Sequence, residues 1–205
     1  MFRIVASLPG VVSKVIFSVC NLDDNELQLL VEKLRGVVNL KHLDVFGNHL
    51  NNVAALSSLI NLKYLTVGNN MITDVSTLSG LINLETLKVD ENSITDVRPL
   101  SVLINLKELH LNNNKITDIS ALSSLINLNT LDLSSNNITM IQNLSSLLHL
   151  KELFLYKNPI DQVDVNALQA ILVHAEITTV CVSLENNRVC KGDRVPPVPR
   201  AHTCE

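Results

Sequence analysis

Residues 106–116, LKELHLNNNKI, contain the pattern that decides the fold of this chain. The same arrangement, L-x-x-L-x-[LV]-x-x-N-x-I, opens at five positions that lie 22 residues apart: Leu62, Leu84, Leu106, Leu128 and Leu150. A fixed period of this length indicates one supersecondary unit stacked on copies of itself, because a single unit cannot bury its apolar face alone.

Each copy predicts a narrow coil of strand, turn and return. In the copy that begins at Leu106, the alternation between Leu109 and Leu111 predicts a short strand with one buried face. The asparagines at 112–114 follow as a turn, and the remaining residues are too few for a full α-helix, so we expect a 3₁₀ return.

Stacking places one asparagine of every coil in a column, where its amide can bridge backbone groups of two coils. We interpret this column as structural: Asn48, Asn70, Asn92, Asn114, Asn136 and Asn158.

These copies, together with the Ile-Thr-Asp segments at 72–74, 94–96 and 116–118, resemble leucine-rich repeats of the internalin and phosphatase-regulatory-subunit branch. The resemblance implies an α/β fold, a curved right-handed solenoid with a parallel sheet of about eight strands on its concave face. Short 3₁₀ or turn returns would form the convex face. The family also implies that the concave face grips proteins.

Longer units bracket the regular coils. Residues 25–34 read as an amphipathic helix after a cap at Asp24 or Asn25, as in ribonuclease-inhibitor-type repeats, and residues 165–174 read as a second helix. We therefore expect one solenoid over 1–183, followed by a polar Pro-rich tail over 184–205. Its parts are an N-terminal helix-containing unit (1–39), regular repeats (40–163) and a C-terminal helix and strand cap (164–183).

The composition of the chain limits the classes of partner that it can bind. The net charge is −4 without a basic run, which argues against nucleic acid, and no apolar stretch is long enough to insert in a membrane. No zinc-type spacing or phosphate loop is present, so we expect no metal and no cofactor. We also expect a monomer. The tail segment 195–200 contains P-x-x-P beside Arg200, which leaves a polyproline ligand as an alternative role for it.

The arrangement of the cysteines favours a cytoplasmic location for the protein. The four cysteines do not form the paired clusters that close extracellular repeat caps, so we expect reduced thiols in a cytoplasmic protein. A Cys181–Cys190 or a Cys190–Cys204 bridge stays open, as do secretion and delivery into another cell.

The outward positions of the concave sheet are the candidate binding surface. Four of the six aromatic residues fall on them, and such side chains are enriched where interfaces concentrate their energy. The alternative is that Phe154 and Tyr156 are covered by the C-terminal segment and that Phe46 packs on its neighbours. The candidate residues are His42, Asp44, Phe46, Tyr64, Thr66, Lys88, Asp90, Glu108, His110, Asn112, Asp132, Glu152, Phe154 and Tyr156.

The sequence thus predicts a non-catalytic protein-binding module. Glu108, His110 and Asp132 have side chains suited to acid–base catalysis, but an open sheet lacks the enclosed pocket that catalysis requires. Two alternatives follow from the resemblance: a regulatory subunit of an enzyme such as a phosphatase, and a microbial effector or virulence factor that binds a host protein.

Overall fold

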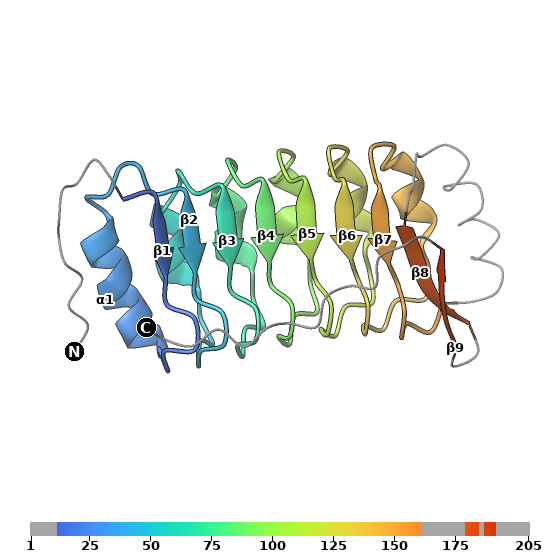
Figure 1. Cartoon of the computed structure of the whole chain (residues 1–205), viewed down its shortest axis with the longest axis horizontal. Coiled ribbons are helices and arrows are strands. Elements are labelled where there is room, and N and C mark those ends of the chain that lie inside the picture. Colours follow the sequence, from blue (N-terminus) through green and yellow to red (C-terminus); the bar gives the residue numbers. More distant parts are fainter. Residues whose placement is uncertain (1–11, 161–178, 185–186, 192–205) are drawn as a thin grey trace.

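The computed structural model describes residues 12–160, 179–184 and 187–191, and these form a row of stacked coils (Figure 1). One strand from each coil joins a single sheet whose spatial order follows the chain. The strands are β1 (Lys14–Ile16), β2 (His42–Asp44), β3 (Tyr64–Thr66), β4 (Thr86–Lys88), β5 (Glu108–His110), β6 (Thr130–Asp132), β7 (Glu152–Phe154), β8 (Thr179–Leu184) and β9 (Asn187–Lys191).

Strands β1 to β8 are parallel, which confirms the predicted solenoid sheet. Equivalent residues of the repeat pair across strands, so that Leu87 lies opposite both Leu65 and Leu109. The ninth strand, β9, runs antiparallel to β8 and lies within the segment that we expected to be tail. The expected second helix at 165–174 and the P-x-x-P motif lie outside the described residues.

The returns are short 3₁₀ helices, as the length of the repeat predicts. They are η1 (Ala54–Ser58), η2 (Ser76–Gly80), η3 (Arg98–Val102), η4 (Ser120–Ser124) and η5 (Gln142–Ser146). The aspartate of an Ile-Thr-Asp segment accepts a hydrogen bond from the first residue of the 3₁₀ helix that follows. The backbone N–H of Ser76 donates to Asp74 Oδ1 at 2.7 Å, and that of Ser120 donates to Asp118 Oδ1 at 2.8 Å.

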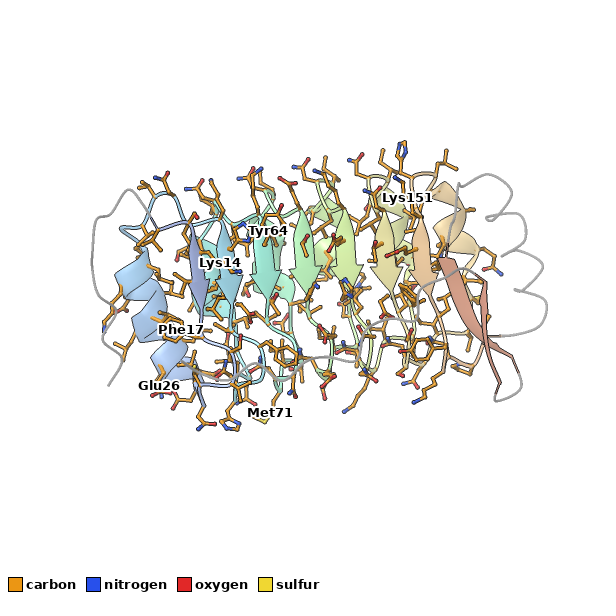
Figure 2. All side chains as sticks on the ribbon, viewed as in Figure 1. Lys14, Phe17, Glu26, Tyr64, Met71 and Lys151 are labelled. Carbon is orange, nitrogen blue, oxygen red and sulfur yellow. The ribbon has the colours of Figure 1, made fainter. Side chains whose placement is uncertain are left out.

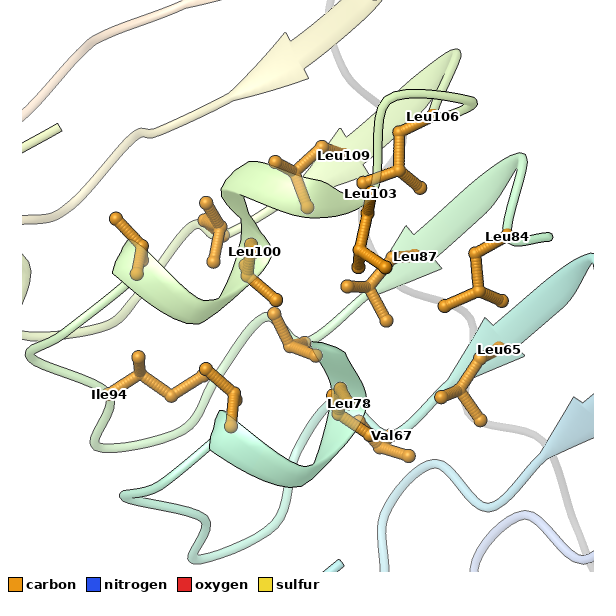
Figure 3. Close-up of a cluster of buried hydrophobic side chains, with 14 of the residues drawn as sticks. Leu65, Val67, Leu78, Leu84, Leu87, Ile94, Leu100, Leu103, Leu106 and Leu109 are labelled. Atoms are coloured by element: carbon orange, nitrogen blue, oxygen red, sulfur yellow. The ribbon is translucent and has the colours of Figure 1, made fainter. Parts of the chain in front are cut away.

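The apolar positions of the repeat fill the space between sheet and returns (Figure 3). Leu87 and Leu109 enter from the strands, Leu100 and Leu103 from η3 and its end, and all four are fully buried. The coils that begin at Leu40, Leu62, Leu84, Leu106 and Leu128 supply the same set, so the core is continuous along these coils. Such burial contributes on the order of 1.5–3 kcal/mol per side chain.

The helix α1 (Asp24–Leu34) closes the first end, which confirms the helix predicted there. Its face of Leu27, Leu30, Val31 and Leu34 is buried. Asp23 is the cap, rather than Asp24 or Asn25 as expected: its carboxylate accepts from Glu26 N at 2.8 Å, and Glu26 accepts from Asp23 N at 3.2 Å. The reciprocal capping box decides the start, because it satisfies two otherwise unpaired N–H groups.

The asparagine column is a ladder of hydrogen bonds, as predicted. Asn114 Oδ1 accepts from the backbone N–H of Ile94 in the preceding coil at 3.0 Å. Its Nδ2 donates to Val89 O of that coil and to Leu111 O of its own coil, both at 3.0 Å. One buried side chain therefore satisfies three backbone groups and ties two coils together.

A second column consists of turn residues in the left-handed backbone region. The positions Gly47, Asn69, Glu91, Asn113, Ser135 and Lys157 all have φ between 49° and 66°, and Val19 takes the same place in the first coil with φ of 54°.

Cys20 follows Val19, and its backbone N–H donates to Asn48 Oδ1 at 3.0 Å. The sulfur of Cys20 is disulfide-bonded, so the expectation of reduced thiols is wrong for this residue.

Candidate functional site

The candidate surface is the sheet face, which we define as the outward side chains of β1 to β7 and of the residue two positions after each strand. Register pairs His42 with Tyr64, Tyr64 with Thr86, and Thr86 with Glu108, so the first predicted row is a row in the structure. Adjacent members lie about 4.7–4.9 Å apart along the backbone.

Exposure divides the predicted residues into three groups. Tyr64 and Glu108 are exposed, and three side chains are buried: Asp90, Asp132 and Phe154. Half-buried residues make up the rest: His42, Asp44, Phe46, Thr66, Lys88, His110, Asn112, Glu152 and Tyr156. With 5% of its surface exposed, Phe154 is not part of the accessible face. Whether the C-terminal segment covers it concerns residues outside those described.

The first strands carry an open patch, which we call the β1–β3 patch: Lys14, Ile16, His42 and Tyr64. The rings of His42 and Tyr64 stack with centroids 4.0 Å apart and planes 9° from parallel. Lys14 pairs in register with His42, and Ile16 is 54% exposed although it is aliphatic. Figure 2 shows Lys14 on β1 and Tyr64 on β3, the strands on either side of β2.

Two residues of this patch were missed by the sequence reasoning. Lys14 and Ile16 flank the inward Val15, so the alternation that identified the first coil also places them outward. The sequence contains that signal, but the predicted rows begin at the second coil. Burial, with Lys14 nearby as the second cause, lowers the pKa of the His42 imidazole, which is therefore a neutral ring beside Tyr64 at neutral pH.

Two of the predicted aspartates serve the backbone. Asp44 Oδ1 accepts from Phe46 N at 2.9 Å, and Asp132 Oδ1 accepts from Ser134 N at 2.9 Å. Each bond spans two residues and shapes the turn that follows the strand. These carboxylates stabilise the end of the strand, whatever else they contact.

The polar middle of the sheet face has two shifted groups. Burial raises the pKa of the Asp90 carboxyl to about 6, and the neighbouring Glu91 acts in the same direction. Burial also lowers the pKa of His110 to about 4, with Lys88 as a second cause. His110 is therefore uncharged at neutral pH and forms no ion pair with a carboxylate there.

Other kinds of site are not found in the described part of the chain. No group of three His, Cys, Asp or Glu side chains is placed to hold a metal ion among the described residues. Within the same ranges, no helix has the length and apolar character to span a membrane. A shallow depression lies away from the sheet face, at the edge where the strands begin, and is lined by Asn105, Lys107, Asn127, Asn129 and His149.

Comparison with family models places leucine-rich repeats on the regular coils. A model described as leucine rich repeats in two copies matches residues 38–80 and 82–124. A second leucine-rich-repeat model matches residues 124–139. A comparison with curated proteins found no significant match.

Solved structures agree with these matches. An internalin (inlF) from Listeria monocytogenes is 29% identical with a TM-score of 0.65, over 72% of this chain and 49% of its own. Internalin C2 from the same species is 28% identical with a TM-score of 0.69, over 83% of this chain and 80% of its own.

A leucine-rich-repeat protein from Leptospira interrogans is 29% identical with a TM-score of 0.65, over 71% of this chain and 38% of its own. This chain thus spans about half the length of the first of these structures and less of the third. From its repeats, its sheet and these likenesses, the chain is an internalin-like leucine-rich-repeat protein.

Proposed function

We propose that this protein is a non-catalytic module that binds a protein partner through the first strands of its sheet face. Leucine-rich-repeat proteins typically mediate protein–protein interaction, which gives the general function. The observation that favours this end of the sheet is the β1–β3 patch, where an exposed aromatic ring is preorganised by stacking on His42.

The chemistry of the patch suits a protein surface. Tyr64 and Ile16 offer apolar area, and Lys14 adds a cation at the side of it. Tyrosine is enriched at interface positions that dominate binding energy, since it combines a large ring with a polar group. Because the stack already fixes Tyr64, binding would cost little extra ordering of that side chain.

Catalysis is not part of the proposal. Asp132 is engaged by the Ser134 backbone, and the His110 imidazole is neutral with a pKa of about 4. A general base needs a pKa near the working pH and a pocket that positions the substrate. The sheet face offers a broad surface instead of such a pocket.

Affinity capture with the intact protein tests the proposal. The double variant Ile16→Ser/Tyr64→Ala should lose a partner that the parent protein retains, with a cost of at least about 2 kcal/mol for a dominant tyrosine. Leu29→Ser is the matched control, since Leu29 is 57% exposed on α1. Partners that bind the double variant and the parent equally would contradict the assignment of this surface.

A further inference from the structure

A row of exposed aliphatic side chains runs along the edge of the solenoid where the strands begin. One such residue stands in each of six consecutive coils, two positions before the first leucine of the repeat motif. We call this row the aliphatic ridge, and each member has between 52% and 64% of its surface exposed: Val38, Ile60, Ile82, Ile104, Ile126 and Leu148.

The ridge does not contribute to the core. Leu81 and Leu84 on either side of Ile82 are fully buried, and they supply the apolar contacts of that part of the coil. Scattered exposed aliphatic residues are ordinary on protein surfaces. Six of them in one row, at the same position of six consecutive coils, form a continuous apolar stripe, and stripes of this kind mark interaction sites.

Side-chain hydrogen bonds hold the backbone of the ridge in place. Asn83 Nδ2 donates to Ile60 O at 2.9 Å, and Asn105 Nδ2 donates to Ile82 O at 2.9 Å. Asn127 continues the series to Ile104 O at 2.8 Å. Each bond joins one coil to the next, so the ridge is preorganised and its ordering costs little on binding.

Charge lies on one flank of the ridge. Three residues after each ridge residue comes a position that we call the lysine row: Lys41, Lys63, Glu85, Lys107, Asn129 and Lys151. Four lysines and one glutamate give this row a net charge of +3, with Glu85 paired to both Lys63 and Lys107. Figure 2 shows Lys151 at this edge.

The opposite flank is uncharged in five of the six coils. Three residues before five of the ridge residues stands a serine in every case: Ser57, Ser79, Ser101, Ser123 and Ser145. Val38 has Arg35 at this place, so the edge presents an apolar stripe with the lysine row along one side and a single cation, at its first coil, on the other. A complementary partner carries apolar residues in a line and acidic residues along one side of that line.

The spacing of the ridge fits a helix. Five steps of about 4.8 Å separate the first and last ridge residues, which gives a length of about 24 Å. An α-helix of about 16 residues has that length, and its apolar stripe repeats every turn at about 5.4 Å. We propose that the aliphatic ridge and the lysine row dock an amphipathic helix of a protein partner, with acidic side chains along one flank of its apolar stripe.

Other occupants fit the charges less well. In a ridge-to-ridge contact, a second copy of this chain places lysines or serines opposite the lysine row. An anionic membrane is disfavoured by the net charge of −4 and by the lack of any aromatic residue in the ridge, because aromatic side chains are the usual anchors at a bilayer surface. The site is separate from the sheet face and stands without the function proposed there.

The test uses two synthetic 18-residue helical peptides with the same leucine stripe, one with glutamates along a flank and one with lysines there. The intact protein should bind the glutamate peptide, and Ile82→Ser/Ile104→Ser should weaken that binding at least about tenfold. Met71→Ser is the matched control, since Met71 is 48% exposed outside the ridge. Equal circular dichroism spectra and melting temperatures would show that the variants fold.

The lysine peptide should bind at least about tenfold more weakly than the glutamate peptide, and added salt should reduce the difference. No binding of the glutamate peptide at millimolar concentration, or equal binding by the ridge variant, would overturn the proposal. If the peptide does not bind, two other results would also overturn the proposal. One is that the parent protein, but not the ridge variant, sediments with phosphatidylserine vesicles. The other is that the parent protein, but not the ridge variant, forms a dimer in size-exclusion chromatography.

Discussion

The carboxylate of Asp90 lies directly over Gly68. A Cβ built on Gly68 would be 2.7 Å from Asp90 Oδ1 and 3.0 Å from its Cγ, which is closer than side chains approach one another. The two residues occupy the same position in neighbouring coils. The backbone of Gly68 has no positive φ, so the glycine is required by this close approach and not by its conformation.

Gly68→Ala should lower the free energy of unfolding by roughly 1–3 kcal/mol, because the new methyl group displaces a buried carboxylate. Adding Asp90→Ala should recover most of that loss, a coupling that urea denaturation of the two single variants and the double variant would measure. Gly80→Ala is the control, since nothing lies within 4 Å of its built Cβ. Equal losses in both alanine variants would contradict the contact.

Asp90→Asn should stabilise the protein at neutral pH. The folded-state pKa of Asp90 is about 6 against an ordinary value of 3.8, so the folded protein binds more protons than the unfolded chain between these values. The free energy of unfolding therefore falls as the pH rises from about 4 to about 6. Removing the carboxylate should gain about 1–3 kcal/mol at pH 7.

The gain should disappear near pH 3, where the carboxyl is protonated in both states. Thermal or urea unfolding of the parent and of Asp90→Asn at the two pH values checks the sign. A gain of the same size at both would mean that ionisation of Asp90 is not its cause.

Asn114→Ala should cost about 2–3 kcal/mol, because three backbone groups lose their hydrogen-bond partner in a buried place. Asn105→Ala removes an asparagine from the exposed edge, where water replaces the bond to Ile82 O, and should cost less than about 1 kcal/mol. The denaturant midpoints of the two variants show which substitution costs more stability. A reversed ranking would contradict the structural role of the column.

Val19→Asn should raise the free energy of unfolding by about 1 kcal/mol. A branched side chain at φ of 54° is strained, whereas asparagine tolerates this region and stands in the same column at Asn69 and Asn113. Val102→Asn replaces a similarly exposed valine without positive φ and should give no such gain. A melting-temperature comparison of the two variants is sufficient.

The repeat register accounts for most of the architecture. It gave the direction of Leu87 and Leu109, the asparagine ladder and the 3₁₀ returns, because each depends only on position within the coil. Strand β9 follows no repeat and was not expected. Its pairing with β8 depends on a contact that no periodicity encodes.

The candidate site was harder to predict than the fold. Register separates inward from outward positions, but it does not tell how far an outward side chain is covered, so Phe154 was expected to be exposed and is buried. Register also does not tell which outward groups are hydrogen-bonded within the chain: the Asp44 carboxylate accepts from the backbone of its own turn, and its role as a partner contact stays a prediction. The aliphatic ridge repeats at the same 22-residue spacing in the sequence, but it lies outside the concave positions that the prediction covers.

The asparagine ladder also sets how this protein can change length. Asn114 bonds to a carbonyl 25 residues back and accepts from an amide 20 residues back, so neighbouring coils are matched to each other at one fixed offset. An insertion of one whole 22-residue coil reproduces every such match, while an insertion of a few residues within a strand breaks them on both sides. Duplication therefore extends the molecule in complete steps, and each step lengthens the sheet face and the aliphatic ridge together.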